Sequence, residues 1–185
     1  MFERYIEEAR RAIFFAVWEA RQAGSAYIEP EHLLLSLTHD ADSKANRLFG
    51  LAAHAENFRK QLGLPLQAEQ APKSRDLPLS NASKRVLAYA AEEAHRLRSE
   101  PIGTEHLFLG LLRENRSRVL EALAAAGIDL RSARKRIAQD SALPIMEHEP
   151  ELTETSPKFL KLIATPLLLI GVIALIYLIF RLVSS

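Results

Sequence analysis

Apolar residues recur at three- and four-residue steps through most of the first 140 positions, the spacing that gathers them on one face of an α-helix. The first such stripe ends at Gly24, a good helix carboxyl cap, and contains Phe2, Ile6, Ala9, Ile13, Ala16, Val17 and Ala20. The same pattern predicts helices over residues 30–37, 44–51, 53–62, 81–98, 104–114, 116–126 and 129–138. Because no stretch alternates apolar and polar residues with period two, we predict an all-α fold.

The chain carries the same helical unit twice. Glu31-His32-Leu33 returns as Glu105-His106-Leu107, 74 residues later, and Glu19-Ala20 returns as Glu93-Ala94 at the same step. Beyond residues 39–43 the step becomes 75, which indicates one residue gained or lost in a loop. A single copy of roughly 60 to 65 residues is marginal for an independent core. We therefore predict two pseudo-symmetric four-helix repeats packed as one domain.

The predicted organisation has five parts, whose boundaries follow changes in composition. They are a first repeat at 1–64, a connector at 65–78, a second repeat at 79–139, an acidic proline-containing linker at 140–158 and a C-terminal segment at 159–185. The linker holds four glutamates and three prolines between Asp140 and Lys158, a composition typical of an extended, solvated stalk.

Residues 162–180, from Leu162 to Phe180, form a run of 19 residues without a charge, between Lys161 and Arg181. As a helix the run would be about 28 Å long, close to the hydrocarbon thickness of a bilayer. A buried core helix is the alternative, but this run is apolar on every face. We predict a single-pass C-terminal transmembrane helix, a tail anchor in the cytoplasmic membrane. Because the first thirty residues carry charge throughout, with no secretory segment, we expect the repeats in the cytosol.

Composition and short motifs limit the classes of activity that we expect of this chain. Lysine plus arginine number 24 against 23 acidic residues, so no overall field favours nucleic acid. The chain has no cysteine, no phosphate-binding Gly-Lys-Ser/Thr loop and no Gly-x-Ser-x-Gly elbow, so we expect no enzyme activity and no cofactor. The Glu31-His32 and Glu105-His106 pairs fall at helix starts, where Thr104 can cap with its hydroxyl and the glutamates favour the helix dipole. A metal site there would need a third ligand, and we predict none.

The doubled unit, with Gly103-Thr104-Glu105-His106-Leu107 leading into Leu109-Gly110-Leu111-Leu112, resembles the Clp repeat domain, the amino-terminal module of Clp unfoldases. The likeness covers about residues 2–138 and is greatest to the ClpC branch. It implies two four-helix repeats that bind substrates or adaptors and pass them to AAA+ ATPase rings. The sequence has no motif for such rings, so we expect a stand-alone binding domain without the unfolding motor.

The resemblance also implies a binding chemistry. In ClpC-like members the glutamate of this motif, with a hydroxyl near the start of each repeat, is implicated in recognising phosphorylated arginine. Copy two keeps Glu105 and offers Ser80 as the hydroxyl, whereas copy one keeps Glu31 but has Ile6 at the hydroxyl position. A carboxylate can receive a guanidinium through two hydrogen bonds, so these residues are candidates for contacting a partner.

A second candidate surface comes from comparing the copies. Phe14 and Trp18, four residues apart on one helix, correspond to Ala88 and Glu92 in copy two. Either the two aromatic side chains fill space between the copies, or they form an exposed docking ridge for a protein partner.

The sequence thus favours a membrane-anchored protein-binding module that captures substrates or adaptors for Clp-type chaperone and protease machinery at the cytosolic face. Its expected partners are client or adaptor proteins, a Clp ATPase and, through residues 162–180, the lipid bilayer. The alternative is a membrane scaffold or regulatory protein that uses the Clp repeat fold without Clp partners and forms a homo-oligomer. A hydrolase built on the two Glu-His pairs is the third class.

Overall fold

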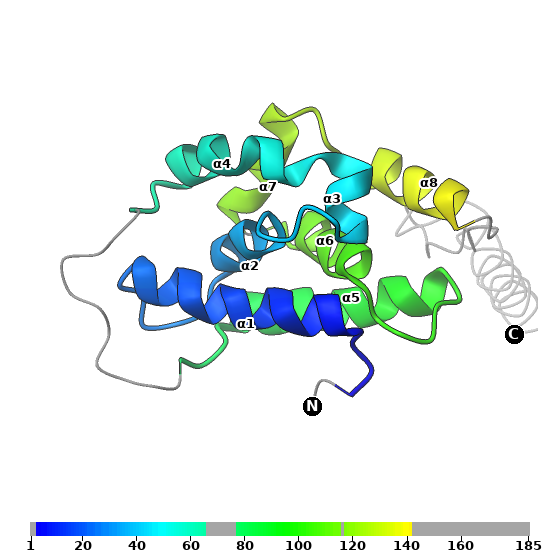
Figure 1. Cartoon of the computed structure of the whole chain (residues 1–185), viewed down its shortest axis with the longest axis horizontal. Coiled ribbons are helices and arrows are strands. Elements are labelled where there is room, and N and C mark those ends of the chain that lie inside the picture. Colours follow the sequence, from blue (N-terminus) through cyan, green and yellow to red (C-terminus); the bar gives the residue numbers. More distant parts are fainter. Residues whose placement is uncertain (1–2, 66–76, 116, 142–185) are drawn as a thin grey trace, which may run out of the picture. The chain divides into compact units, whose positions relative to one another are not determined.

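Helices make up the regular structure of this chain in the computed structural model, which describes residues 3–65, 77–115 and 117–141 (Figure 1). Copy one contains α1 (Glu7–Gln22), α2 (Pro30–Leu37), α3 (Lys44–Phe49), the short 3-10 helix η1 (Leu51–His54) and α4 (Ala55–Leu62). Copy two contains α5 (Asn81–Arg96), α6 (Thr104–Arg113), α7 (Arg118–Ala125) and α8 (Leu130–Asp140). The described residues form eight α-helices and no strand, so the all-α prediction is confirmed for this part of the chain.

Local sequence explains most helix boundaries. Ser43, Ser80 and Asp129 each accept a hydrogen bond from a backbone N–H in the first turn of the helix that follows, at 3.4, 3.1 and 3.0 Å. The predicted helix at 44–51 is shorter in the structure. Gly50 lies in the left-handed region, with φ of +63°, and ends α3 before Leu51 begins the 3-10 turn.

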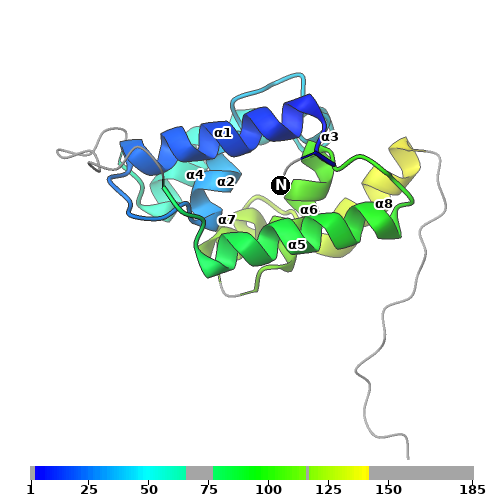
Figure 2. The ribbon, with the colours of Figure 1, turned by 90° about the horizontal axis from the view of Figure 1, so that it is seen from below.

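The helices of the two copies pack in layers (Figures 1 and 2). The second helices, α2 and α6, lie in the middle and contact each other, with α1 packed on α2 and α5 packed on α6. Helices α3, α4, α7 and α8 cover the opposite side of this central pair. Nearly every side chain of α2 and α6 is therefore buried, including the Glu-His motif at the start of α6.

The two copies also exchange backbone hydrogen bonds. The segment before α1 pairs with the loop before α6, because the Ile6 N–H donates to Ile102 O at 3.0 Å and the Ile102 N–H donates to Arg4 O at 2.7 Å. The segment before α5 pairs in the same way with the loop before α2, through Ile28 and Ser80. Each copy thus completes the loop that leads into the other copy's central helix.

Several predicted segments fall outside the described residues. These are residues 66–76 of the connector, 142–158 of the linker and the whole C-terminal segment at 159–185. Within residues 3–65, 77–115 and 117–141, no helix has the length and apolar character needed to cross a membrane.

Candidate functional site

The histidines of the two Glu-His motifs close the amino-terminal ends of the central helices. The Glu29 N–H donates to His32 Nδ1 at 2.9 Å, and the Gly103 N–H donates to His106 Nδ1 at the same distance. Both rings are buried. The Thr104 hydroxyl, predicted to cap α6, instead accepts a hydrogen bond from the Ala45 N–H at 3.2 Å. The imidazoles therefore do the capping, because each reaches back one turn to the residue before the helix.

Both capping histidines are held in the neutral form. Burial lowers the pKa of His32 to about 4, and burial likewise lowers the pKa of His106. The geometry requires the same form, since a nitrogen that accepts a backbone hydrogen bond cannot carry a proton. The two histidines are thus structural groups of the helix ends.

The glutamates beside them face cations from the opposite copy. Glu105 is buried, and Lys44 Nζ of α3 lies 3.5 Å from its Oε1. Glu31 is less enclosed, and Arg118 Nε of α7 lies 3.9 Å from its Oε1. Lys44 and Arg118 are themselves the first residues of equivalent helices. The pseudo-symmetry therefore places one carboxylate and one cation from different copies at each of two related positions.

The two positions differ in how far they are closed. Lys44 also contacts Ser141 Oγ at 2.9 Å and Asp140 Oδ2 at 3.4 Å, which covers Glu105 from the end of α8. Glu105 Oε2 is buried and accepts no hydrogen bond from the described residues. At the other position the Arg118 side chain is 61% exposed. The Glu31 carboxylate is thus the more accessible of the two.

Ser80 lies beside the copy one motif. Its backbone N–H donates to Ile28 O at 3.1 Å, in the loop that leads to Glu31, while its hydroxyl caps α5. The loop that leads to Glu105 pairs instead with the segment containing Ile6. Sequence reasoning grouped Ser80 with Glu105 because both belong to copy two. The exchange of backbone hydrogen bonds between copies brings Ser80 to the loop before Glu31.

Sequence reasoning missed a pair of buried carboxylates, Glu19 in α1 and Glu93 in α5. Glu19 accepts hydrogen bonds from Arg59 Nη2 at 2.7 and 2.8 Å, and its Oε1 lies 2.7 Å from His39 Nε2. Glu93 has the equivalent surroundings and accepts hydrogen bonds from Arg113 and Arg134 at 2.8 to 3.1 Å. The available signal was an acidic residue repeated on the apolar face of both first helices.

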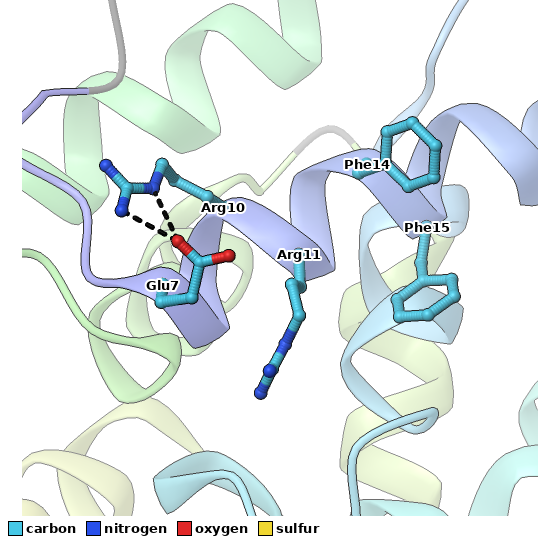
Figure 3. Close-up of a pocket in the computed structure, with 5 residues that line it drawn as sticks. All are labelled: Glu7, Arg10, Arg11, Phe14 and Phe15. Carbon is cyan, nitrogen blue, oxygen red and sulfur yellow. Dashed lines mark hydrogen bonds and ion pairs between the residues drawn. The ribbon is translucent and has the colours of Figure 1, made fainter.

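The aromatic pair on α1 lies on the surface. Phe14 is 71% exposed and Trp18 is 45% exposed, so neither fills space between the copies. Phe15 stacks on the His39 ring with 5.0 Å between centroids, and Trp18 meets the same ring edge-on at 5.5 Å. Phe14 and Phe15 line a shallow pocket of about 370 Å³ together with Glu7, Arg10 and Arg11 (Figure 3).

Neither candidate surface has a metal-binding geometry. Among residues 3–65, 77–115 and 117–141, no group of three or more histidine, aspartate or glutamate side chains converges as ligands would. The neutral histidines are engaged in capping, and the motif carboxylates face Lys44 and Arg118. The side chains that these two surfaces present are charged and aromatic.

Two interlocked four-helix repeats with paired acidic positions define a double-repeat helical domain. The chain belongs to the Clp repeat family: the model of the Clp repeat (R) N-terminal domain matches residues 4–88 and 78–165. The Clp N-terminal domain is a protein-binding module and not a catalytic one, and it resembles the adaptor- and substrate-binding modules of Clp ATPases.

Sequence relatives agree with this family. The chain is 33% identical over 146 residues to the chloroplastic chaperone protein ClpC of Pisum sativum, covering 77% of this chain and 16% of that protein. It is also 33% identical over 146 residues to the ClpA homologue of Guillardia theta, an ATP-binding subunit of the ATP-dependent Clp protease, covering 77% and 18%. The chain thus spans about a sixth of the length of these curated relatives.

Solved structures show the same fold. The N-terminal domain of the chaperone ClpD from Arabidopsis thaliana matches with a TM-score of 0.61 at 26% identity, covering 77% of this chain and 97% of that one. The Hsp104 N-terminal domain from Candida albicans matches with a TM-score of 0.61, covering 77% and 94%. Its 16% identity shows the fold alone.

Proposed function

We propose that this protein is a membrane-tethered binding module that captures client or adaptor proteins for a Clp-type ATPase at the cytosolic face of the membrane. The observation that carries the proposal is the membership of both repeats in the Clp N-terminal domain family. The partly exposed Glu31 and the exposed aromatic side chains of α1 supply the described surface with groups that could contact a protein.

Membrane tethering is the part of the proposal that rests on sequence. Residues 162–180 carry no charge and are flanked by Lys158, Lys161 and Arg181. A helix of that length matches the hydrocarbon thickness of a bilayer. Alkaline extraction of membranes should leave the full-length protein in the pellet, and replacing three of the leucines in this run with aspartate should release it. Release of the unaltered protein would contradict tethering.

The cytosolic location is tested separately from the tether. A glycosylation acceptor placed in the connector at 66–76 should stay unmodified when the full-length protein is inserted into microsomes, whereas an acceptor added after Ser185 should be modified. The opposite pattern would place the repeats on the other side of the membrane and remove access to cytosolic Clp ATPases.

Of the two motif carboxylates, Glu31 is the one we propose for contact with a cationic group of a client. It is the more accessible, and the cation that faces it lies 3.9 Å away and is itself well exposed. Arginine offers a carboxylate a planar pair of donors, and phosphorylated arginine keeps that geometry at its unmodified nitrogens. Titration with phosphoarginine peptides should show affinity lost in Glu31→Gln, with a smaller change in Glu105→Gln. Equal affinity in all three proteins would exclude this contact.

The Clp connection has its own test. Full-length protein, crosslinked in its own membrane and purified in detergent, should carry a Clp ATPase or unfolded client proteins. A sample that carries neither, and whose native mass is a multiple of the chain mass, would favour the alternative of an oligomeric membrane scaffold. The aspartate variant that loses the tether shows whether the multiple depends on the apolar run.

A further inference from the structure

Phe14 and Trp18 are exposed aromatic residues that the fold itself does not require. The equivalent positions of α5 carry Ala88 and Glu92, which are also exposed, and α5 packs on α6 as α1 packs on α2. The second copy therefore has the same helix packing with a small residue and a charged residue at these two places. Large aromatic groups in solvent are characteristic of protein contact surfaces.

The two side chains belong to a straight stripe along α1. Glu7, Arg11, Phe14 and Trp18 are all exposed and follow one another at steps of four, three and four residues. These steps keep the four positions on one face of the helix, with the charged pair in its first turns and the aromatic pair in its later turns. The same alternation of three- and four-residue steps forms the seam of paired helices.

Ring contacts and hydrogen bonds support Trp18 and the neighbouring Phe15. Phe15 stacks on the His39 ring, and Trp18 meets the same ring edge-on. His39 Nε2 lies 2.7 Å from the buried Glu19 carboxylate. Arg59 donates two hydrogen bonds to the same carboxylate. Since Phe15 and Trp18 are held through His39, a partner would lose little side-chain entropy on docking there.

The backbone of the partner must satisfy its own hydrogen bonds. The described residues contain no strand whose edge could add an extended peptide, and the polar backbone groups inside α1 are bonded within the helix. An extended segment laid on α1 would therefore leave its N–H and C=O groups to water. A partner helix has no such requirement, and its apolar side chains can seat beside Phe14 in the shallow pocket (Figure 3).

The charges around the pocket indicate the charge of the residues that flank the apolar face of the partner helix. The pocket is lined by two guanidinium groups, Arg10 and Arg11, and one carboxylate, Glu7. Arg10 pairs with Glu7 at 2.7 Å and Arg11 with Asp40 at 2.9 Å, yet each arginine side chain remains about half exposed. Because exposed ion pairs contribute little to stability, the half-exposed guanidinium groups can also donate hydrogen bonds to a carboxylate of a partner. The lining thus complements an acidic flank.

We propose that the α1 ridge, formed by Arg11, Phe14 and Trp18 with Arg10 beside it in the pocket, binds an amphipathic α-helix of a partner protein. The helix presents large apolar residues at three- and four-residue steps to Phe14 and Trp18, and acidic residues to the two arginines. The inference rests on the proposed protein-binding function and adds its surface and the structural class of its partner.

The first experiment maps the contact in the full-length protein in its own membrane. A photo-crosslinking amino acid replaces Phe14 in one protein and Ala88, the exposed twin position, in the matched control. Mass spectrometry then identifies the crosslinked segment of the partner. The expected result is crosslinking from position 14 to an amphipathic, acidic helical segment, at a yield at least about tenfold above that from position 88. Equal yields, or a segment without helical periodicity, would overturn the proposal.

The second experiment measures affinity with the segment so identified, made as a synthetic peptide. Trp18 is the single tryptophan of the chain, so its emission reports directly on the ridge. Binding should shift that emission to shorter wavelength and raise the helicity of the peptide. The double variant Phe14→Ala/Trp18→Glu, which copies the α5 residues, should bind a labelled peptide at least about tenfold more weakly. Unchanged affinity in this variant would overturn the proposal.

Controls distinguish the ridge from the wider function. Tyr27→Ala removes an exposed aromatic residue outside the stripe and should leave peptide affinity unchanged. If crosslinks to Clp components or clients arise only from a probe at Arg118, beside Glu31, the binding function stands and the ridge inference fails. If no probe captures such a protein, the proposed function fails together with the inference.

Discussion

His32 makes the stability of the protein depend on pH. Its pKa is lowered from 6.5 to about 4, chiefly by burial, so the folded protein stays neutral there while the unfolded chain takes up a proton. The contribution of neutral His32 is complete above pH 6.5 and is lost as the pH falls from 6.5 toward 4. The free energy of unfolding should therefore decrease by about 3 kcal/mol across that range from this residue. Urea unfolding at pH 7.5, 5.5 and 4.5 measures the decrease.

The matched variant is His32→Gln. Glutamine at the third helical position can still reach back to the Glu29 N–H, but it does not titrate. The free energy of unfolding of the variant should be close to that of the parent near pH 5, and it should decrease less between pH 6.5 and 4. Because the pKa of His106 is lowered in the same direction, some acid sensitivity should remain. Identical pH profiles in the two proteins would show that His32 is not responsible.

Glu92 and Glu93 are adjacent in the sequence, and together they allow the contribution of an exposed charge to be compared with that of a buried charge. Glu93 is fully buried and holds Arg113 and Arg134, whereas Glu92 pairs with Arg113 from a side chain that is 58% exposed. Glu93→Gln should lower the free energy of unfolding by about 3 kcal/mol, because it removes the buried negative charge that Arg113 and Arg134 share. Glu92→Gln should change it little. Thermal and urea unfolding measure the stability loss of each variant. Similar losses in the two variants would contradict this prediction.

At the element scale, Gly110 of α6 allows the backbones of α5 and α6 to approach each other closely. A Cβ atom at Gly110 would overlap Val86 O and lie 3.1 Å from Ala90 N. Gly110→Ala should therefore push α6 away from α5 and cost about 1 to 3 kcal/mol of stability. Ser36 is the equivalent residue of α2, and Ser36→Ala serves as the control, since a Cβ is already accommodated there. A loss in the serine variant as large as in the glycine variant would contradict this account.

The same helices show what the sequence could and could not predict. Periodic apolar positions and local capping residues located each helix to within a few residues, since both are local properties of the chain. The Glu19 and Glu93 ion pairs were not predicted, because Arg59 and Arg134 come from the fourth helix of each repeat. That Ser80 adjoins the loop before Glu31 was not predicted for a related reason, since only the packed structure shows which copy supplies the adjoining loop.

For the whole domain, the duplication explains why both surfaces exist. The two copies repeat the same structural groups: each has a capping histidine, a motif glutamate and a buried carboxylate. The copies differ at exposed positions such as Phe14 against Ala88, and also at buried positions such as Leu34 against Phe108. The exposed differences can serve contact with a partner without changing the core that both copies share.

The exchanged backbone hydrogen bonds predict that neither repeat folds alone. Residues 1–76 would lose the pairing of Ile28 with Pro78 and Ser80, and residues 77–141 would lose the pairing of Ile102 with Arg4 and Ile6. Each half would also expose the side of its central helix that contacts the other copy. At that size the remaining core is marginal, so each half should give a weak helical circular-dichroism signal without a cooperative thermal transition.

Mixing the halves should restore helicity and a single cooperative transition whose midpoint rises with concentration, because folding is then coupled to association. The intact chain with a ten-residue glycine-serine insertion between residues 70 and 71 is the control. It should melt within a few degrees of the parent, since lengthening a loop costs little entropy. A cooperative transition in either isolated half would mean that one repeat carries its own core. The exchanged hydrogen bonds would then connect two independent domains and would not be required for folding.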